Sequence, residues 1–387
     1  MSKEAKLVID FGNSQTRFAV MFKGKENQTA YFHVSNSFVE LPEGYTVPEA
    51  YRDDPETQFI QLGGSTYAHG SIVESEFSKS SLRPSTLTKK FNSITTDLAL
   101  ELALVLGIRR IAEYAGQTSN EEGLADELEW KIFALLPPND IAIGRDKMRE
   151  RYKNMQSVSY IKPDADGSFE NSIPTVFKTD ITAVNVIPEG YAAFFGAMFK
   201  TPGVFNDGVD KDTVESLTLI VDIGSGTTDC CIVNNAQLVS SSQDTINIGG
   251  RHVVNEVSRM LRADNIELAD SVVEGIVNTG VYTISPKRSI DYTDMVNAAR
   301  AEVARKINAG ITRYLESSDF SPTQIAGILP VGGGSVRLEG SGLRPLSEFV
   351  CDEIQRNATF SDVVPTPVGI SPRDLNVIGA AEIAGAR

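Results

Sequence analysis

The sequence contains few cysteines and few histidines. Among its 387 residues there are three cysteines, two of them adjacent within an apolar segment, and three histidines that are far apart in the chain. Three cysteines in this arrangement form neither a disulfide framework nor a metal cluster, and the scattered histidines disfavour a zinc site. Because disulfides belong to oxidising compartments, we expect the protein to work in a reducing one.

Positive charge is also scarce, and so are long apolar runs. Lys and Arg number 36 against 51 Asp and Glu, which gives a formal net charge of −15. An acidic surface repels nucleic acid and anionic membranes, so we expect no direct DNA binding, and any link to DNA would need a basic adaptor protein. The longest apolar stretch, residues 98–108, contains Glu101 and is shorter than the ~20 residues that span a bilayer. Since the chain passes from Met1 into a strand without an apolar signal segment, we expect a cytoplasmic protein.

The chain is organised around residues 219–233, LIVDIGSGTTDCCIV. Two apolar runs of strand type flank a polar turn with two glycines, which predicts a β-hairpin whose backbone amides can converge on an anion. Asp222 stands directly before the turn, where a carboxylate beside bound phosphates needs a divalent cation, directly or through water. Taken alone, an ordinary hairpin with a polar tip explains the segment equally well. The candidate phosphate-binding residues of this turn are Gly224, Ser225, Gly226, Thr227 and Thr228.

A second copy of the pattern opens the chain at residues 9–20, IDFGNSQTRFAV. Aligned without gaps, Asp10 falls on Asp222, whereas Arg17 takes the place of Asp229 and adds a cation to the first turn only. Two such units predict two similar domains whose hairpins face one ligand, a polyphosphate with its metal. The candidate residues of the first turn are Gly12, Asn13, Ser14, Gln15, Thr16 and Arg17.

Two more glycine-rich segments follow predicted strands. One precedes a predicted helix at residues 251–261, whose exposed amides can also face a ligand. The other follows an apolar strand at residues 325–331 and permits close approach to a flat or sugar-bearing group, although a plain loop is the alternative. Their candidate residues are Gly249 and Gly250 in the first segment, and Gly332, Gly333, Gly334 and Ser335 in the second.

Taken in order, these features resemble the actin and heat-shock-chaperone ATPase superfamily over nearly the whole chain. Residues 10–17 and 222–229 resemble its two phosphate loops, and residues 331–335 resemble its adenosine loop. The helices expected at residues 189–197 and 377–383 resemble its two connecting helices. Arg17, the SNSF segment at residues 35–38 and the LLPP segment at residues 135–138 are most similar to bacterial plasmid-segregation actins of the ParM type.

The resemblance implies an α/β fold of two similar actin-like, ribonuclease-H-like domains, with mixed sheets flanked by helices and a nucleotide cleft between them. We expect domain I at residues 1–187, with a loop-rich insertion at about 41–90, completed by residues 373–387. Domain II would comprise residues 188–372, with a helical insertion at about 250–310.

The resemblance also assigns roles to particular residues. Asp10 and Asp222 would hold Mg²⁺ through its water shell, while the two turns bind the phosphates of ATP; the sequence leaves GTP open. A long amphipathic helix predicted at residues 292–315 carries Glu302, Arg305 and Lys306 on its charged flank. These three side chains reach the base or ribose, or simply form an exposed face. Glu189, after Pro188, would orient the attacking water, or alternatively cap the helix that follows.

Four functions share this fold, and the fold alone does not choose among them. The leading interpretation is an ATP-hydrolysing protein that polymerises into dynamic filaments for plasmid DNA segregation, coupled to the plasmid by a DNA-binding adaptor. A chaperone would need a peptide-binding domain after the ATPase, and the sequence ends just past the last expected helix. A membrane-linked actin would carry a terminal amphipathic helix, which neither end of the sequence shows. A sugar-kinase-like phosphotransferase or another bacterial cytoskeletal actin remains the alternative.

Overall fold

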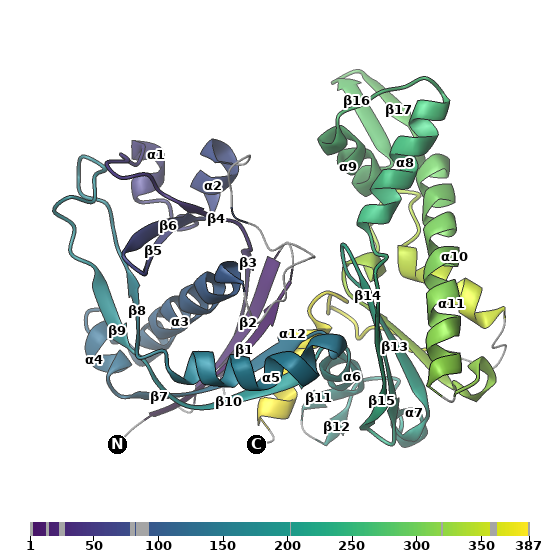
Figure 1. The fold of residues 1–387 in the computed structure, drawn as a ribbon, viewed down its shortest axis with the longest axis horizontal. Helices are drawn as coiled ribbons and strands as arrows, with labels where there is room; N and C mark the ends of the chain where they lie inside the picture. The colour runs from purple at the N-terminus through teal and green to yellow at the C-terminus, as the bar shows by residue number, and fades with distance from the viewer. Residues whose placement is uncertain are drawn as a thin grey trace. The chain divides into compact units, whose positions relative to one another are not determined.

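The helices and strands form two units that are each built around a five-stranded sheet (Figure 1). The computed structural model describes residues 3–12, 15–22, 28–77, 82, 93–201, 203–318, 320–356 and 362–385. The first unit comprises residues 1–136 and 140–187, and the second comprises residues 137–139 and 188–386. Among the described residues, none of the helices combines the length and the apolar character needed to cross a bilayer.

The main sheet of the first unit has the strand order β10-β7-β1-β2-β3. Its central strand, β1, pairs antiparallel with β2 through the first hairpin and parallel with β7 on the other side. The last five residues of β1 are all buried, as expected for a strand covered on both faces. The bounds are Lys3–Phe11 for β1, Gln15–Phe22 for β2, Gln28–Ser35 for β3, Leu128–Leu136 for β7 and Asp180–Pro188 for β10.

Two long helices, α3 (Ile94–Ala115) and α5 (Pro138–Lys153), pack in the core of this unit. The α3 helix ends at Gly116, which adopts the left-handed conformation with φ 66°. The α5 helix starts at Pro138, the second of two consecutive prolines. A short helix, α4 (Glu121–Ala125), lies in the acidic segment between α3 and β7.

A second five-stranded sheet in this unit corrects our expectation for residues 41–90. Its order is β4-β6-β5-β8-β9, and residues 41–77 supply two of its strands together with the short helices α1 and α2. The segment is therefore not a loop-rich insertion; most of residues 78–90 lie outside the described part. The bounds are Phe38–Glu40 for β4, Glu49–Arg52 for α1, Gln58–Leu62 for β5, Ser65–His69 for β6, Ser71–Glu76 for α2, Ser157–Tyr160 for β8 and Thr175–Lys178 for β9.

The main sheet of the second unit repeats the arrangement of the first, with the order β15-β14-β13-β18-β19. Its central strand, β13, pairs antiparallel with β14 through the second hairpin and parallel with β18 on the other side. The sequence predicted this internal similarity from the two hairpins. The bounds are Thr218–Ile223 for β13, Thr228–Asn234 for β14, Gln237–Ile246 for β15, Gly327–Val331 for β18 and Asp362–Val363 for β19.

The two faces of this sheet carry different helices. Leu219, Val221 and Ile223 of β13 belong to a core cluster with α8, α10 and α11, whereas Ile220 belongs to a cluster with α6 and α12.

The region expected as a helical insertion, residues 250–310, also contains a β-hairpin, β16-β17. The bounds are Tyr191–Met198 for α6, Lys211–Glu215 for α7, Arg251–Ala263 for α8, Asp270–Thr279 for α9, Val281–Ser285 for β16, Arg288–Asp291 for β17, Thr293–Ser317 for α10, Leu346–Gln355 for α11 and Leu375–Gly385 for α12; a two-stranded ribbon, β11 (Phe199–Thr201) and β12 (Val204–Phe205), follows α6.

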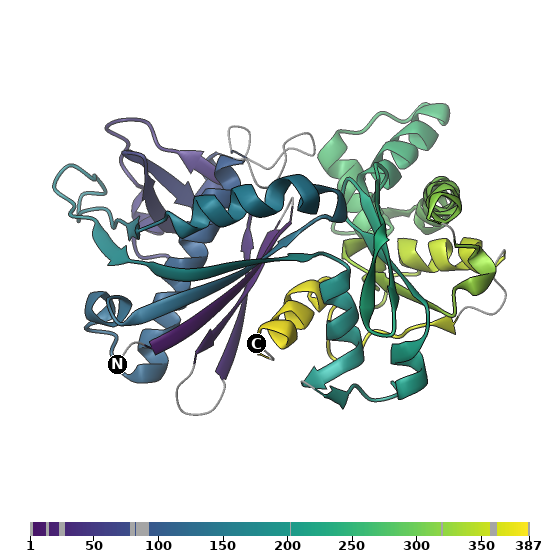
Figure 2. The same ribbon diagram turned by 60° about the horizontal axis from the view of Figure 1, so that its bottom comes forward.

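The helices α6 and α12 lie side by side in both views (Figures 1 and 2). A β-carbon at Gly379 would lie 1.8 Å from the carbonyl oxygen of Ala192, and one at Gly196 would lie 2.5 Å from that of Leu375. Small residues therefore allow the two backbones to touch. Through this contact α12 groups with the second unit, whereas we expected residues 373–387 to complete the first domain.

Candidate functional site

The turn of the second hairpin presents unused backbone donors. The turn comprises residues 224–227 between β13 and β14, and the Gly224 amide donates to the Thr227 carbonyl over 2.9 Å. In the described part of the chain, the amides of Ser225, Gly226 and Thr227 have no hydrogen-bond partner. Consecutive free amides in a turn form a concavity that suits an anion.

Two carboxylates stand at the base of this turn. Asp222 and Asp229 are directly opposite in the β13-β14 register, so their side chains lie on the same face, and each is only 8% exposed. The Asn376 carboxamide donates to Asp222 Oδ2 over 2.8 Å, and the Thr245 hydroxyl donates to Asp229 Oδ1. The sequence predicted a ligand role for Asp222 but not for Asp229; the strand register brings the second carboxylate into place. Buried carboxylate oxygens are the ligands that Mg²⁺ prefers.

Gly332 lies against the same aspartate. It has φ 81°, and a β-carbon there would lie 2.2 Å from Asp222 Oδ1. A β-carbon at Gly334 would meet the side chain of Ile223 at 2.5 Å. The glycines at the end of β18 thus permit close packing on β13, and they bring the expected adenosine segment next to Asp222. Ser335 closes the segment, because its hydroxyl donates to the Val331 carbonyl over 2.9 Å.

The structure corrects the expectation for Gly249 and Gly250. The amides of Gly250 and Arg251 donate to the carbonyls of Gly224 and Ser225 at 2.9 and 2.7 Å, and the Gly249 amide donates to Nδ1 of His252. These amides at the start of α8 are therefore occupied and not exposed to a ligand. A β-carbon at Gly249 would lie 2.6 Å from the Gly224 carbonyl oxygen, so this glycine lets α8 support the hairpin turn.

Glu189 lies at the junction between β10 and α6, where it is 6% exposed. The N-cap of α6 is Gly190, with φ 74°, so Glu189 precedes the cap and lies outside the first helical turn. The Gly190 amide donates to Asn376 Oδ1 over 2.9 Å. Asn376, which the sequence did not single out, therefore joins the Glu189 segment to Asp222.

The first hairpin belongs to the other unit. Asp10, 7% exposed, is opposite Arg17 in the β1-β2 register, and the Arg17 guanidinium donates to Gln15 Oε1 over 2.9 Å. The Thr16 hydroxyl is fully buried and has no partner among the described residues. A β-carbon at Gly12 would lie 2.3 Å from the Gln15 carbonyl oxygen, so only glycine fits. The candidates Asn13 and Ser14 lie outside the described residues.

A neighbouring turn supports this hairpin. The Asn36 carboxamide donates to the Gly12 carbonyl over 2.7 Å, and His69 Nε2 bonds to the Ser35 carbonyl over 2.7 Å. Both Asn36 and His69 are buried, and burial lowers the pKa of His69, which favours the neutral ring. The SNSF segment thus contacts the first turn directly.

Glu302, Arg305 and Lys306 lie together on α10, as expected. With residues of α8 they line a hollow of about 490 Å³. Arg305 and Lys306 lie 2.5 and 3.7 Å from the Glu302 carboxylate. Glu256 of α8 is buried beneath them, and a hydrogen bond from Arg259 lowers the pKa of its carboxyl.

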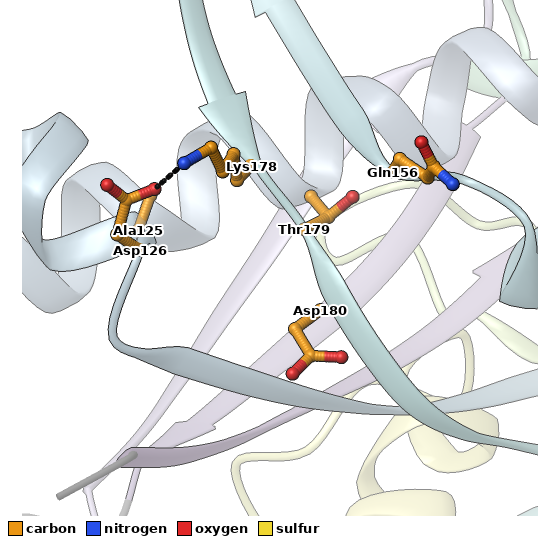
Figure 3. A pocket seen from close by; sticks show the side chains of 6 residues that line it. All are labelled: Ala125, Asp126, Gln156, Lys178, Thr179 and Asp180. Atoms are coloured by element: carbon orange, nitrogen blue, oxygen red, sulfur yellow. Dashed lines mark ion pairs between the residues drawn. The ribbon is translucent and has the colours of Figure 1, made fainter.

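Another hollow, of about 360 Å³, lies on the first unit (Figure 3). Its lining includes Gln156, Thr179 and Asp180, and the Lys178 ammonium points to the Asp126 carboxylate at 3.5 Å. None of the predicted site residues contributes to this hollow, so we do not assign it to the candidate site.

Comparison with protein families gives one match. The family described as archaeal actin homologue MreB-like, C-terminal, matches residues 220–341, which all lie in the second unit. No curated protein matches the sequence significantly.

Solved structures resemble the whole chain. Ta0583, an archaeal actin homologue, has a TM-score of 0.66 and 14% identity, with full coverage of both chains. A ParM from a Clostridium botulinum filament has a TM-score of 0.64 and 14% identity, also with full coverage of both. ParM from Bacillus thuringiensis has a TM-score of 0.57 and 14% identity over 98% of each chain.

These likenesses confirm the expected fold class, an α/β protein with the actin-like fold. Within that class, ParM-type proteins are among its structural neighbours, as the sequence motifs indicated.

Proposed function

We propose that this chain is an actin-like ATPase that binds ATP with Mg²⁺ and assembles into dynamic filaments. Two kinds of neighbour support this proposal. Ta0583 has been solved in complex with ADP and the Bacillus thuringiensis ParM with ATP, and the Clostridium botulinum ParM was solved as a filament. GTP is the alternative nucleotide.

The observation that carries the proposal is the turn at residues 224–227. Three consecutive amides without partners in the described chain stand next to two buried carboxylates, Asp222 and Asp229. Amide donors suit phosphate oxygens, and carboxylates suit the hydrated Mg²⁺ that accompanies polyphosphates. An ordinary hairpin tip explains the free amides but does not require two acidic groups buried below them.

The candidate residues other than Gly249 and Gly250 then have roles. Amides and hydroxyls of the two turns bind phosphate oxygens, and Asp10 and Asp222 hold the metal through water. Bound Mg²⁺ would neutralise the charge that develops on the phosphates. The carboxylate of Glu189 accepts a hydrogen bond from the attacking water and takes up its proton. The glycine segment at residues 332–335 and the charged residues of α10 would border the adenosine.

In the cell, we propose, the filaments segregate plasmid DNA in the cytoplasm. The formal charge of −15 opposes direct binding to DNA, so a basic adaptor protein would connect the filament to the plasmid. The likeness to ParM proteins supports this step.

The test combines phosphate release with light scattering after addition of ATP and Mg²⁺. Wild-type protein should hydrolyse ATP and scatter light transiently. Glu189→Gln should lower turnover by about a hundredfold or more, the contribution of a general base, and its filaments should form but persist. The control is Glu113→Gln, an exposed position on α3, which should behave as wild type. Turnover that depends on an added sugar, without assembly, would instead identify a kinase and overturn the proposal.

A further inference from the structure

Asn376 is a buried side chain that joins three separate elements of the second unit. It lies in the first turn of α12 and is 7% exposed. Its Nδ2 donates to Asp222 Oδ2 over 2.8 Å, at the end of β13. Its Oδ1 accepts the Gly190 amide over 2.9 Å, at the start of α6. The two contacts span 154 and 186 residues of sequence.

We propose that Asn376 is a positioning residue, which holds the carboxylates of Glu189 and Asp222 in fixed relation during hydrolysis. This inference rests on the proposed function. Asn376 itself would touch neither nucleotide nor water; it acts through the two groups that it binds.

The chemistry of the two contacts requires a carboxamide. An ionised carboxylate such as Asp222 only accepts hydrogen bonds, and a backbone amide only donates, so the bridging group needs one donor and one acceptor. Asparagine offers both on a short side chain. Aspartate would place a second negative charge against Asp222, and leucine would leave the buried Gly190 amide without a partner.

The backbone around the bridge leaves little freedom. The Gly190 amide belongs to the peptide group that directly follows Glu189, so the hydrogen bond to Asn376 fixes the orientation of that peptide. Gly190 is in the left-handed region, and a β-carbon there would lie 3.1 Å from the Sγ of Cys231. On the other side, the crossing of α12 with α6 at Gly379 holds the Asn376 backbone in place. The hydrogen bond from Gly190 to Asn376 therefore fixes the residue next to Glu189 relative to α12.

The strand pattern explains why the bridge reaches Asp222. Side chains alternate along β13, and Ile220 packs with α6 and α12. Asp222, two residues further, points to the same face and so meets α12. No contact with the opposite face, which carries α10, is involved.

The test compares Asn376→Ala with Asn206→Ala. Asn206 is a matched control: it is 8% exposed, and its Nδ2 donates to the carbonyls of Gly196 and Ala197 at the other end of α6. Asn376→Ala should lower kcat by about 10- to 100-fold with little change in the KM for ATP, the loss expected when a supporting partner of a reactive group is removed. Asn206→Ala should retain the wild-type kcat even where both variants lose stability.

A second comparison separates positioning from general damage. In the Glu189→Gln background, Asn376→Ala should lower kcat less than in wild type, because one of the two groups that it positions no longer acts. Full additivity of the two effects on kcat would contradict the proposal.

A third measurement does not depend on turnover. In nucleotide-free protein labelled with ¹⁵N-glycine, the Gly190 amide should exchange with solvent about tenfold faster in Asn376→Ala than in wild type, and no faster in Asn206→Ala. If wild type hydrolyses ATP but Asn376→Ala keeps its kcat or the Gly190 protection, the positioning role is wrong and the proposed function stands. If wild type does not hydrolyse ATP, the proposed function fails and the positioning role with it.

Discussion

Glu101 is a carboxyl group buried within α3 and has no part in the candidate site. It is 4% exposed, and its Oε2 has no hydrogen-bond partner in the described chain. Burial away from water raises the pKa of this carboxyl from its ordinary 4.5 to about 8. The folded protein therefore keeps a proton on Glu101 over a pH range in which the unfolded chain has lost it.

This difference links the free energy of unfolding to pH. Below pH 4.5 the carboxyl is protonated in both the folded and the unfolded state, so it does not make the free energy of unfolding depend on pH. Above that value the unfolded state binds fewer protons than the folded state, so stability falls as pH rises and stops falling above about pH 8. Each pH unit within the window corresponds to about 1.4 kcal/mol, so at pH 7 the group destabilises the fold by about 3 kcal/mol.

Glu101→Gln removes the titration and preserves the shape of the side chain. Urea unfolding of both proteins should be measured at several pH values from 5 to 8, with the fluorescence of the single tryptophan, Trp130, which is fully buried in the first unit. The free energy of unfolding of Glu101→Gln minus that of wild type should rise by about 1.4 kcal/mol per pH unit. Glu113→Gln, at an exposed position of the same helix, serves as the control variant. A difference between Glu101→Gln and wild type that stays constant across the range would refute the reasoning.

Two further predictions concern packing. Gly379→Ala would place a β-carbon 1.8 Å from the Ala192 carbonyl oxygen, so the free energy of unfolding, measured by thermal unfolding, should fall by about 3 kcal/mol or more. Gly275 of α9 is a contrasting position, because a β-carbon there would have nothing within 4 Å. Gly275→Ala should therefore stabilise the protein by about 0.5 to 1 kcal/mol. All three cysteines are buried, and burial raises the pKa of their thiols, to about 12 for Cys351. A thiol reagent at pH 8 should therefore react slowly with the native protein, and after denaturation it should label all three cysteines. Rapid labelling of the native protein would contradict this packing.

The sequence predicts the two hairpins and the long helix α10 because their signals are local. An apolar run, an aspartate and a glycine turn lie within 15 residues in each hairpin, and α3 is defined by its apolar face and by the glycine that ends it. Each of these signals depends on backbone preferences that act over a few residues. The same reasoning located α10 and α12 closely.

The errors have local causes too. The strands of residues 58–69 are five residues long, and their buried residues are consecutive, so they lack the alternation that identifies a strand in a sequence. Pro137 follows the last residue of β7, and Pro138 is already the first residue of α5, since proline suits the first turn of a helix.

Asp229 and Asn376 could not be assigned from the sequence, because their roles depend on partners distant in the chain. Asp229 is opposite Asp222 only once the strand register is known. Asn376 reaches Asp222 across 154 residues and through a helix crossing that depends on two glycines in different helices. No periodicity or motif near residue 376 encodes that geometry.

The glycine-rich segments show why a motif alone does not identify a phosphate site. Glycine before a helix or after a strand permits close approach, but the approaching group can be a ligand or the chain itself. At Gly249 and Gly332 the approaching group is the chain, because a β-carbon would collide with the hairpin turn or with Asp222. At residues 225–227, by contrast, three consecutive amides of a hairpin turn stay without partners among the described residues. The destination of each backbone hydrogen bond, which the sequence does not reveal, therefore separates the glycines that support the site from the turn that can bind phosphate.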